Sequence, residues 1–365
     1  MEWNKQFKYD PVKPLIESNN PAVFYFTRRD LLQAKVESAS DVLWSLTTPQ
    51  RIINRQEPDG YWKALGKNED YYLVETFKLL QSLVYQFGFD KNHPAIANAC
   101  EYLFSRQTEE GDIRGFIGNQ YAPYYTGIVT ALLINAGYED DPRIEKALQW
   151  LISMRQNDGG WVIGSPGWLG IPNFKWSDMA EITADKNAET LKAFDKSQPF
   201  AHSGTGMVIR AFAAHPQYRK SPEALKAAQL LKSHFFKEDN YNSYKHPDNW
   251  IRFEYPFWWN NLLAALDSVS LIGIPPNDRD IKKALDWFVA NQTESGLWKI
   301  SYSKIHKSPP NSKTEEEKLW ISLAVCRVFQ RYFGLICITV MDISIDSLSS
   351  VLPGPDGGNS ESLKT

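Results

Sequence analysis

The sequence is poor in cysteine, with three in 365 residues, and these three (Cys100, Cys326 and Cys337) lie far apart. So few thiols exclude a disulfide framework or a cysteine-rich zinc site and favour a reducing, cytoplasmic location. An excess of charge of one sign is also lacking, since 40 Lys and Arg oppose 43 Asp and Glu. This balance argues against a basic nucleic-acid surface. No stretch reaches the roughly 20 apolar residues of a membrane span, and the first six residues lack the apolar core of a signal peptide.

A short phrase that contains a turn recurs along the chain. It stands at Gln56–Trp62, Gln107–Ile113, Arg155–Trp161 and Gln292–Trp298, and in three of the four copies Trp follows the glycine turn. Extended upstream, the chain aligns with itself without gaps in blocks that begin at Thr47, Asn98, Lys146, Lys226 and Lys283. Self-similarity at roughly 50 residues is typical of a repeat architecture, in which each unit buries its apolar face against its neighbours.

Two kinds of helix alternate in these repeats. The segment 146–155 has apolar residues at three- and four-residue spacing, which predicts an amphipathic helix. After each turn comes a segment that is apolar on more than one face and is therefore expected to be buried. These segments are Tyr72–Phe87, Tyr124–Ala136, Gly204–Ala214, Phe257–Ile272 and Leu319–Phe333. The alternation predicts an all-α fold, an α/α toroid in which an outer ring of helices surrounds an inner ring.

Five such pairs of helices together with an N-terminal helix near Phe26–Lys35, about five to six hairpins in all, would close the toroid. We therefore expect one domain over residues 1–334, with the repeats starting near Asp41, and a partly disordered C-terminal extension over residues 335–365. An insertion rich in Gly, Pro and Trp follows Trp161 and reaches about Gln198. A loop of this length is often a lid over a functional site.

The residues of the repeated phrase have structural explanations. The glycines (Gly60, Gly111, Gly159 and Gly296) can adopt the backbone angles of a tight turn, and the acidic residues before them can cap free amide groups. Glutamine has both a donor and an acceptor with which to bridge helix ends, and the Trp can cover the junction. We therefore expect the phrase to join helices and not to carry out chemistry.

The phrase, as in Gln56-Glu-Pro-Asp-Gly-Tyr-Trp62, resembles the repeats of squalene cyclases and other terpenoid cyclases, whose α/α toroid is shared by the β-subunits of protein prenyltransferases. The resemblance covers about residues 41–333. It implies a ligand in a central cavity at the amino-terminal ends of the inner helices, and a small hydrophobic or isoprenoid substrate. No cofactor is expected, and the location would be cytoplasmic, with peripheral contact to a membrane as an option.

The resemblance also implies a set of aromatic residues at the rim of the cavity: Tyr72, Tyr121, Tyr124, Tyr125, Phe257, Trp258, Trp259 and Trp320. Aromatic faces stabilise cations, and a carbocation on a polyene needs such walls. The alternative is that the rings simply fill a wide barrel. Arg210 stands in an apolar helix, where it is expected to contact an anionic ligand, to pair with another side chain or to lie on an exposed stripe.

Squalene-type cyclases protonate their substrate with an Asp-x-Asp-Asp run, and this sequence has no such run. The candidate catalytic residues are therefore Asp70, Glu75 and Glu254, as proton donors, together with His202. A carboxylic acid donates a proton only when burial or a neighbouring carboxylate raises its pKa, and helix capping is the other explanation for Asp70 and Glu75. The Asp-x-Cys pair of zinc-dependent protein prenyltransferases is missing at inner-helix starts, so we expect no metal and no protein prenylation.

Three functions are compatible with these observations. The first is a terpenoid-cyclase-like protein, an isomerase or lyase, that acts on or binds a polyprenyl substrate. The second is a carbohydrate-active α/α barrel, a polysaccharide lyase or a glycosidase, because aromatic rings stack on sugars while Arg, His and Tyr can neutralise a uronate and move its proton. The third is a toroid that binds a lipid or a protein partner without catalysis. The family resemblance favours the first.

Overall fold

The computed structural model describes residues 3–67, 71–116, 122–163, 195–239, 246–303 and 312–334. In these ranges the regular secondary structure is helical, and strand-like pairing is limited to two isolated bridges. The all-α prediction is therefore confirmed. Most of the insertion after Trp161 and the whole C-terminal extension lie outside the described residues, so the predictions of a lid and of a disordered tail stay predictions.

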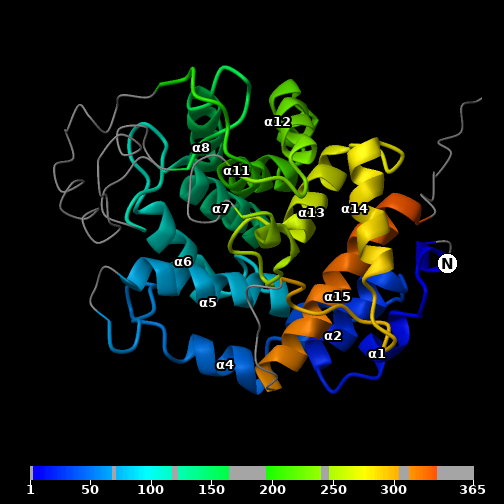
Figure 1. The fold of residues 1–365 in the computed structure, drawn as a ribbon. Coiled ribbons are helices and arrows are strands. Elements are labelled where there is room, and N and C mark those ends of the chain that lie inside the picture. Colours follow the sequence, from blue (N-terminus) through cyan, green and yellow to red (C-terminus); the bar gives the residue numbers. More distant parts are fainter. Residues whose placement is uncertain are drawn as a thin grey trace, which may run out of the picture. The chain divides into compact units, whose positions relative to one another are not determined.

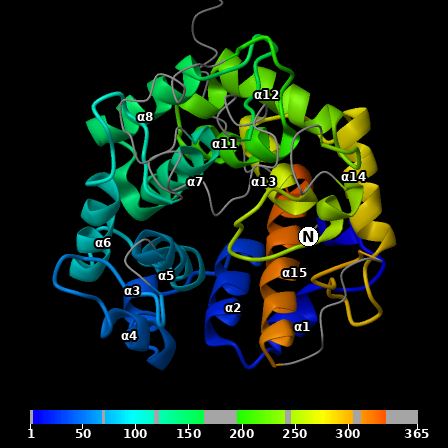
Figure 2. The ribbon, with the colours of Figure 1, turned by 60° about the vertical axis from the view of Figure 1, so that its left-hand side comes forward.

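Residues 1–334 form one compact unit, whose helices lie in two rings (Figures 1 and 2). The outer ring consists of α1 (Val12–Ile16), α4 (Thr47–Ile53), α6 (Pro94–Phe104), α8 (Pro142–Ser153), α12 (Pro222–Ser233) and α14 (Arg279–Ala290). The inner ring consists of α2 (Pro21–Phe26), α5 (Tyr72–Phe87), α7 (Pro123–Leu133), α11 (His202–Ala214), α13 (Leu262–Ile272) and α15 (Ser312–Phe333). Each inner helix contacts the next, and α15 contacts α2, so the inner ring is closed. The prediction of an α/α toroid is confirmed.

The predicted bounds of the first inner helix and the predicted start of α13 are wrong. The first inner helix, α2, begins at Pro21, where the Asn20 side chain caps it, and continues as a π-helical turn over Thr27–Leu31. The inner helix expected from Phe257 begins five residues later, because the Asn261 side chain accepts a hydrogen bond from the Ala264 amide and so caps α13. The segment 252–261 is consequently not helical, although its aromatic residues extend the apolar pattern of α13.

The glutamine of the repeated phrase, present in three of the four copies, fastens its turn to the neighbouring unit of the outer ring. Gln56 Nε2 donates to the carbonyl of its own turn glycine, Gly60 (3.0 Å), and to the carbonyl of Ala95 in α6 (2.7 Å). Gln107 repeats this arrangement with Gly111 and with Arg143 in α8. The prediction that the glutamine bridges helix ends is confirmed.

The last copy of the phrase joins the two ends of the outer ring. Gln292 Nε2 donates to the carbonyls of Gly296 and Tyr9, both at 2.9 Å, and its Oε1 accepts from the amides of Lys8 (3.1 Å) and Tyr9 (3.0 Å). The side chain is buried, with 7% of its surface exposed. One glutamine therefore holds the N-terminal segment against the sixth hairpin.

The glycine and the Trp of the phrase complete the junction. Gly111 has a φ of 115°, and a Cβ added to it would lie 2.5 Å from the carbonyl oxygen of Lys146 in α8, so only glycine allows this contact. Trp161 is fully buried, its indole Nε1 donates to the Leu151 carbonyl of the preceding outer helix, and its amide donates to the Thr205 hydroxyl of the following inner helix. Trp62 and Trp298 make the equivalent bonds.

The inner helices are buried because they pack on both sides. Every residue of α7 is buried, and its closest neighbour is α11. Gly127 allows the approach, since a Cβ there would meet the Val208 Cα at 2.6 Å. None of the described helices is long and apolar enough to cross a membrane.

Candidate functional site

The segment 252–261 crosses the interior of the inner ring, where Figure 2 shows it as the yellow-green connection that leads into α13. Arg210 of α11 holds this segment by three hydrogen bonds. Its Nη1 donates to the carbonyls of Phe257 (2.9 Å) and Trp258 (3.1 Å), and its Nη2 donates to the carbonyl of Trp259 (2.7 Å). Gln81 of α5 adds a bond to the Phe257 carbonyl at 2.8 Å. The backbone of a segment without regular structure is thereby satisfied by side chains from two helices.

The segment lines two pockets. We name each pocket after the end of the inner helices, N-terminal or C-terminal, that lies beside it. The N-terminal pocket holds about 370 Å³ and is lined by His202, Ser203, Asn249, Trp250, Arg252, Phe253, Glu254, Trp259, Asn260, Asn261, Ile300, Ser301 and Glu317. The C-terminal pocket holds about 300 Å³ on the other side of the segment and is lined by residues that include Tyr85, Arg210, Tyr255, Asp267 and Arg331. The predicted ligand position, at the amino-terminal ends of the inner helices, corresponds to the N-terminal pocket.

Two carboxyl groups with perturbed protonation line the N-terminal pocket. Burial raises the pKa of Glu254, although hydrogen bonds from the Trp259 and Trp258 amides (2.8 and 3.2 Å to Oε1) and the Arg210 charge oppose the shift. Burial also raises the pKa of Glu317, and the neighbouring charge of Glu254 adds to the effect. Burial of both carboxyl groups and the charge of Glu254 beside Glu317 favour a state in which one of the two is protonated.

His202 is the first residue of α11 and lies in the same pocket with 5% of its surface exposed. Burial lowers its pKa to about 4, even though the Asp239 carboxylate, 3.6 Å from Nε2, opposes the shift. The ring is therefore neutral near pH 7. Its Nδ1 is buried and has no hydrogen-bond partner among the described residues, and its face packs on Trp250 at a centroid distance of 4.5 Å.

The predicted rim aromatics divide into groups. Tyr124 and Tyr125 of α7 lie against each other, and the Tyr125 ring stacks on Phe116 at 4.7 Å. Trp258 meets the edges of Phe77 and Tyr125 and therefore belongs to this packed cluster. Of the predicted rim residues that the structure describes, Trp259 is the one that lines the N-terminal pocket.

The other predicted site residues lie elsewhere. Tyr72 stacks on Tyr61 at the start of α5 and Glu75 lies in the first turn of that helix, while Trp320 is buried in α15 against Tyr255 at 5.6 Å. Phe257 lines the C-terminal pocket. Asp70 and Tyr121 lie outside the described residues. The catalytic and binding roles of all of these residues stay predictions.

Glu317 was not predicted. It lies in the acidic run Glu315–Glu317, directly before the inner helix that the apolar pattern starts at Leu319. In the structure α15 begins earlier, at Ser312, and these additional turns of helix include Glu317, which lines the pocket. Among the described residues, no group of three or more His, Cys, Asp or Glu side chains is placed to hold a metal ion.

Comparisons with known proteins agree with the repeats. Residues 75–193 match the family model of the squalene-hopene cyclase C-terminal domain. A probable squalene-hopene cyclase of Sinorhizobium fredii is 34% identical over 129 residues, which are 30% of this chain and 20% of that protein. The squalene-hopene cyclase of Bradyrhizobium diazoefficiens is 28% identical over 160 residues, 39% of this chain and 24% of that protein. The matches thus span a quarter or less of these relatives' own lengths.

Solved structures are similar at a low level. The type II terpene cyclase MstE of Scytonema is 13% identical, with a TM-score of 0.30 over 80% of this chain and 98% of its own. A family 88 glycosyl hydrolase of Bacteroides vulgatus is 14% identical, with a TM-score of 0.42 over 90% and 92% of the two chains. Scores this low support no functional assignment. The family match over residues 75–193 and the partial matches to squalene-hopene cyclases, together with the helical toroid, confirm the resemblance of this chain to the terpenoid-cyclase α/α-toroid superfamily.

Proposed function

We propose that this terpenoid-cyclase-like protein binds an isoprenoid substrate in the N-terminal pocket and acts on it as an acid, with Glu254 as the proton donor. The observation that carries the proposal is a carboxyl group of raised pKa in a pocket that aromatic rings also line. Acid-initiated cyclisation needs both features, a protonated carboxyl group at working pH and faces that stabilise the cation.

In the proposed reaction the Glu254 carboxyl group gives its proton to one carbon of an alkene. The π electrons form the new C–H bond, and the neighbouring carbon becomes a cation. Trp250 and Trp259, which line the pocket, stabilise that cation through their ring faces. A base must finally remove a proton, and the neutral His202 imidazole or the Glu317 carboxylate can accept it. The pocket volume of about 370 Å³ is near the lower end of ligand sites, about 300–1,000 Å³.

A carbohydrate-active protein is the second candidate, because the same pocket is lined by many polar groups. Arg252, Asn260, Asn261 and Ser301 carry the donors and acceptors that bind sugar hydroxyl groups, and paired carboxyl groups are the catalytic apparatus of most glycosidases.

The test is turnover by the purified protein. Squalene and geranylgeranyl dihydroxybenzoate, the substrate bound in a solved structure of a Scytonema cyclase variant, are offered in parallel with oligouronides. Cyclised products are followed by mass spectrometry and cleaved sugars by their reducing ends. We expect a cyclised product and a loss of about a hundredfold or more in rate for Glu254→Gln.

The matched control is Glu315→Gln, which removes an exposed carboxyl group two residues from Glu317 on the same helix. Its rate should equal that of the unchanged protein. Cleavage of oligouronides without polyene turnover would replace the proposal by the second candidate. A co-purified lipid with no turnover of either class would indicate a binding toroid, and equal rates for Glu254→Gln and Glu315→Gln would exclude Glu254 as the donor.

A further inference from the structure

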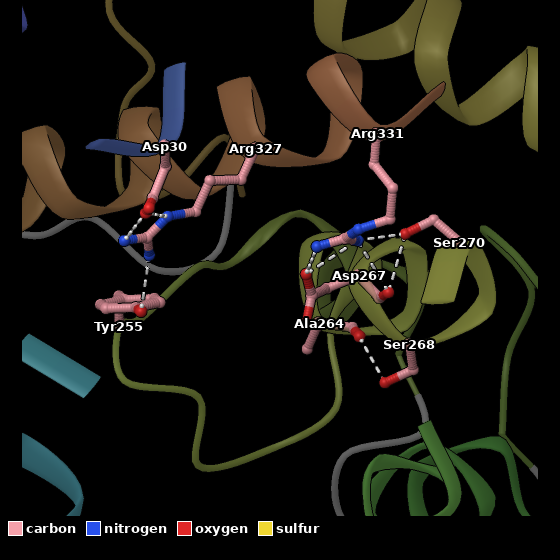
Figure 3. A network of polar contacts seen from close by, with 8 residues as sticks. All are labelled: Asp30, Tyr255, Ala264, Asp267, Ser268, Ser270, Arg327 and Arg331. Atoms are coloured by element: carbon pink, nitrogen blue, oxygen red, sulfur yellow. Dashed lines mark hydrogen bonds and ion pairs between the residues drawn. The ribbon is translucent and has the colours of Figure 1, made fainter. Parts of the chain in front are cut away.

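The C-terminal pocket is separate from the proposed acid site, and its polar groups are arranged in a different way. Arginines dominate them: Arg210, Arg327 and Arg331 line the pocket, and Asp267 is the one carboxylate among its described lining residues. Figure 3 shows that Arg327 and Arg331 both project from α15, the first towards Asp30 and Tyr255 and the second towards Asp267 and Ser270. With Asp30 included, three positive charges face two negative ones.

Three hydrogen-bond donors of this pocket have no acceptor among the described residues. Tyr85 accepts a bond from Asn135 Nδ2 (3.3 Å), and Tyr255 accepts one from Arg327 Nη1 (3.1 Å), but no described residue accepts the hydroxyl proton of either tyrosine. Burial raises the pKa of both hydroxyls, so both keep their protons and remain donors. The Nε of Arg210 is buried and also has no partner among the described residues.

These three donors lie close together. Tyr85, Tyr255 and Arg210 line the same volume of about 300 Å³, and the charges of Tyr255 and Arg210 both influence the pKa of Tyr85. Burial lowers the pKa of Arg210 to about 10, because its bonds go to three carbonyl groups and to no carboxylate. A ligand with several acceptor oxygens and a negative charge would satisfy all three groups at once.

The pocket has a route to solvent and an apolar side. A more open hollow of about 750 Å³ shares Tyr85, Asn135, Tyr255, Arg327 and Arg331 with it and adds Arg29, Asp30 and Asp90. On the opposite side the wall is made of small and aliphatic residues, among them Ile128, Ala131, Ala213 and Leu271. The carbonyl ends of the inner helices oppose an anion here only weakly, because the effect of a helix dipole falls off within about one turn.

We propose that the C-terminal pocket is a second ligand site, which binds the oxyanion end of a small molecule, a carboxylate or a phosphate, with a short apolar body against α7, α11 and α13. Tyr85, Tyr255 and Arg210 Nε donate to the oxyanion, and Arg327 and Arg331 supply long-range charge. The site does not depend on the reaction proposed for the N-terminal pocket.

Isothermal titration at fixed ionic strength tests the site with hexanoate, inorganic phosphate and pyrophosphate. Hexanamide serves as the uncharged match for hexanoate. We expect at least one of the anions to bind, whereas hexanamide should not. Hexanoate and the phosphates distinguish a carboxylate ligand from a phosphate ligand.

The double variant Tyr85→Phe/Tyr255→Phe keeps the ring packing and removes two donors, so binding of the anion should weaken about tenfold or more. Tyr61→Phe, which alters a tyrosine that does not line this pocket, should bind as the unchanged protein does. Arg331→Gln should also weaken binding. Failure of every anion to bind at millimolar concentration, equal affinity for hexanamide, or unchanged affinity in the double variant would overturn the proposal.

Discussion

Gln292 offers a direct test of how the toroid is closed. Its side chain makes four hydrogen bonds, two of them to Tyr9 and one each to Lys8 and Gly296, and it is almost fully buried. Gln292→Met keeps the length of the side chain and removes all four. At about 1 kcal/mol for each bond, the free energy of unfolding should fall by about 4 kcal/mol, which is at the upper end of single substitutions.

Gln56→Met is the matched comparison, since Gln56 occupies the same place in the phrase but makes two such bonds, and about 2 kcal/mol should be lost. Gln149→Met, on the exposed face of α8, should cost less than about 0.5 kcal/mol. Equilibrium unfolding in urea gives the three values.

Hydrogen exchange distinguishes ring closure from a general loss of stability. The amides of Lys8 and Tyr9 donate to Gln292, so in Gln292→Met they should exchange faster than amides of α7 do. In Gln56→Met the same two amides should keep their protection relative to α7. If Gln292→Met costs no more than Gln149→Met, or if the N-terminal amides stay protected, the outer ring is not closed by this residue.

Two further predictions concern the turn glycine and the pocket histidine. Gly111→Ala should lower the free energy of unfolding by about 3 kcal/mol, because it combines backbone strain with a clash against the Lys146 carbonyl. Gly66 also has a positive φ, but a Cβ there would meet open space, so Gly66→Ala should cost about 1 kcal/mol in the same urea assay. Burial lowers the His202 pKa from 6.5 to about 4. Between these two pH values the unfolded chain binds a proton at His202 and the folded protein does not, so the free energy of unfolding falls as the pH decreases. Between pH 7.5 and 5 the unchanged protein should lose about 2 kcal/mol more than His202→Gln, and equal losses would contradict the assignment.

The arrangement of the hairpins could be predicted from the sequence because it is encoded locally and several times. The copies that begin at Gln56 and Gln292 place glutamine, glycine and Trp at the same distances, and the structure uses all three in the predicted way. What the phrase does not reveal is its partner on the inner helix. The Trp62 amide donates to the Thr76 hydroxyl, and such a threonine in an apolar helix carries no distinctive signal.

The candidate site was harder to predict because residues far apart in the sequence build it. Arg210 contacts carbonyl groups 47 to 49 residues away. Because every residue has a backbone carbonyl, the sequence does not indicate which of them are its partners. The spacing of apolar residues therefore predicted that α13 starts at Phe257. In the structure Phe257, Trp258 and Trp259 belong to the crossing segment, residues 252–261, and α13 starts at Leu262. The same spacing placed the start of α15 at Leu319, about two turns too late. Glu317 was therefore not recognised as a residue of the inner helix.

The crossing segment explains why Arg210 and Glu254 both have perturbed pKa values. Arg210 donates to three successive carbonyls of the segment, and Glu254 accepts from two of its amides. Two ionisable side chains thus take the place of the regular hydrogen bonding that the segment lacks. Each is desolvated, so the arginine pKa falls and the glutamate pKa rises, and the segment that separates the two pockets also sets the protonation of the acid in one of them.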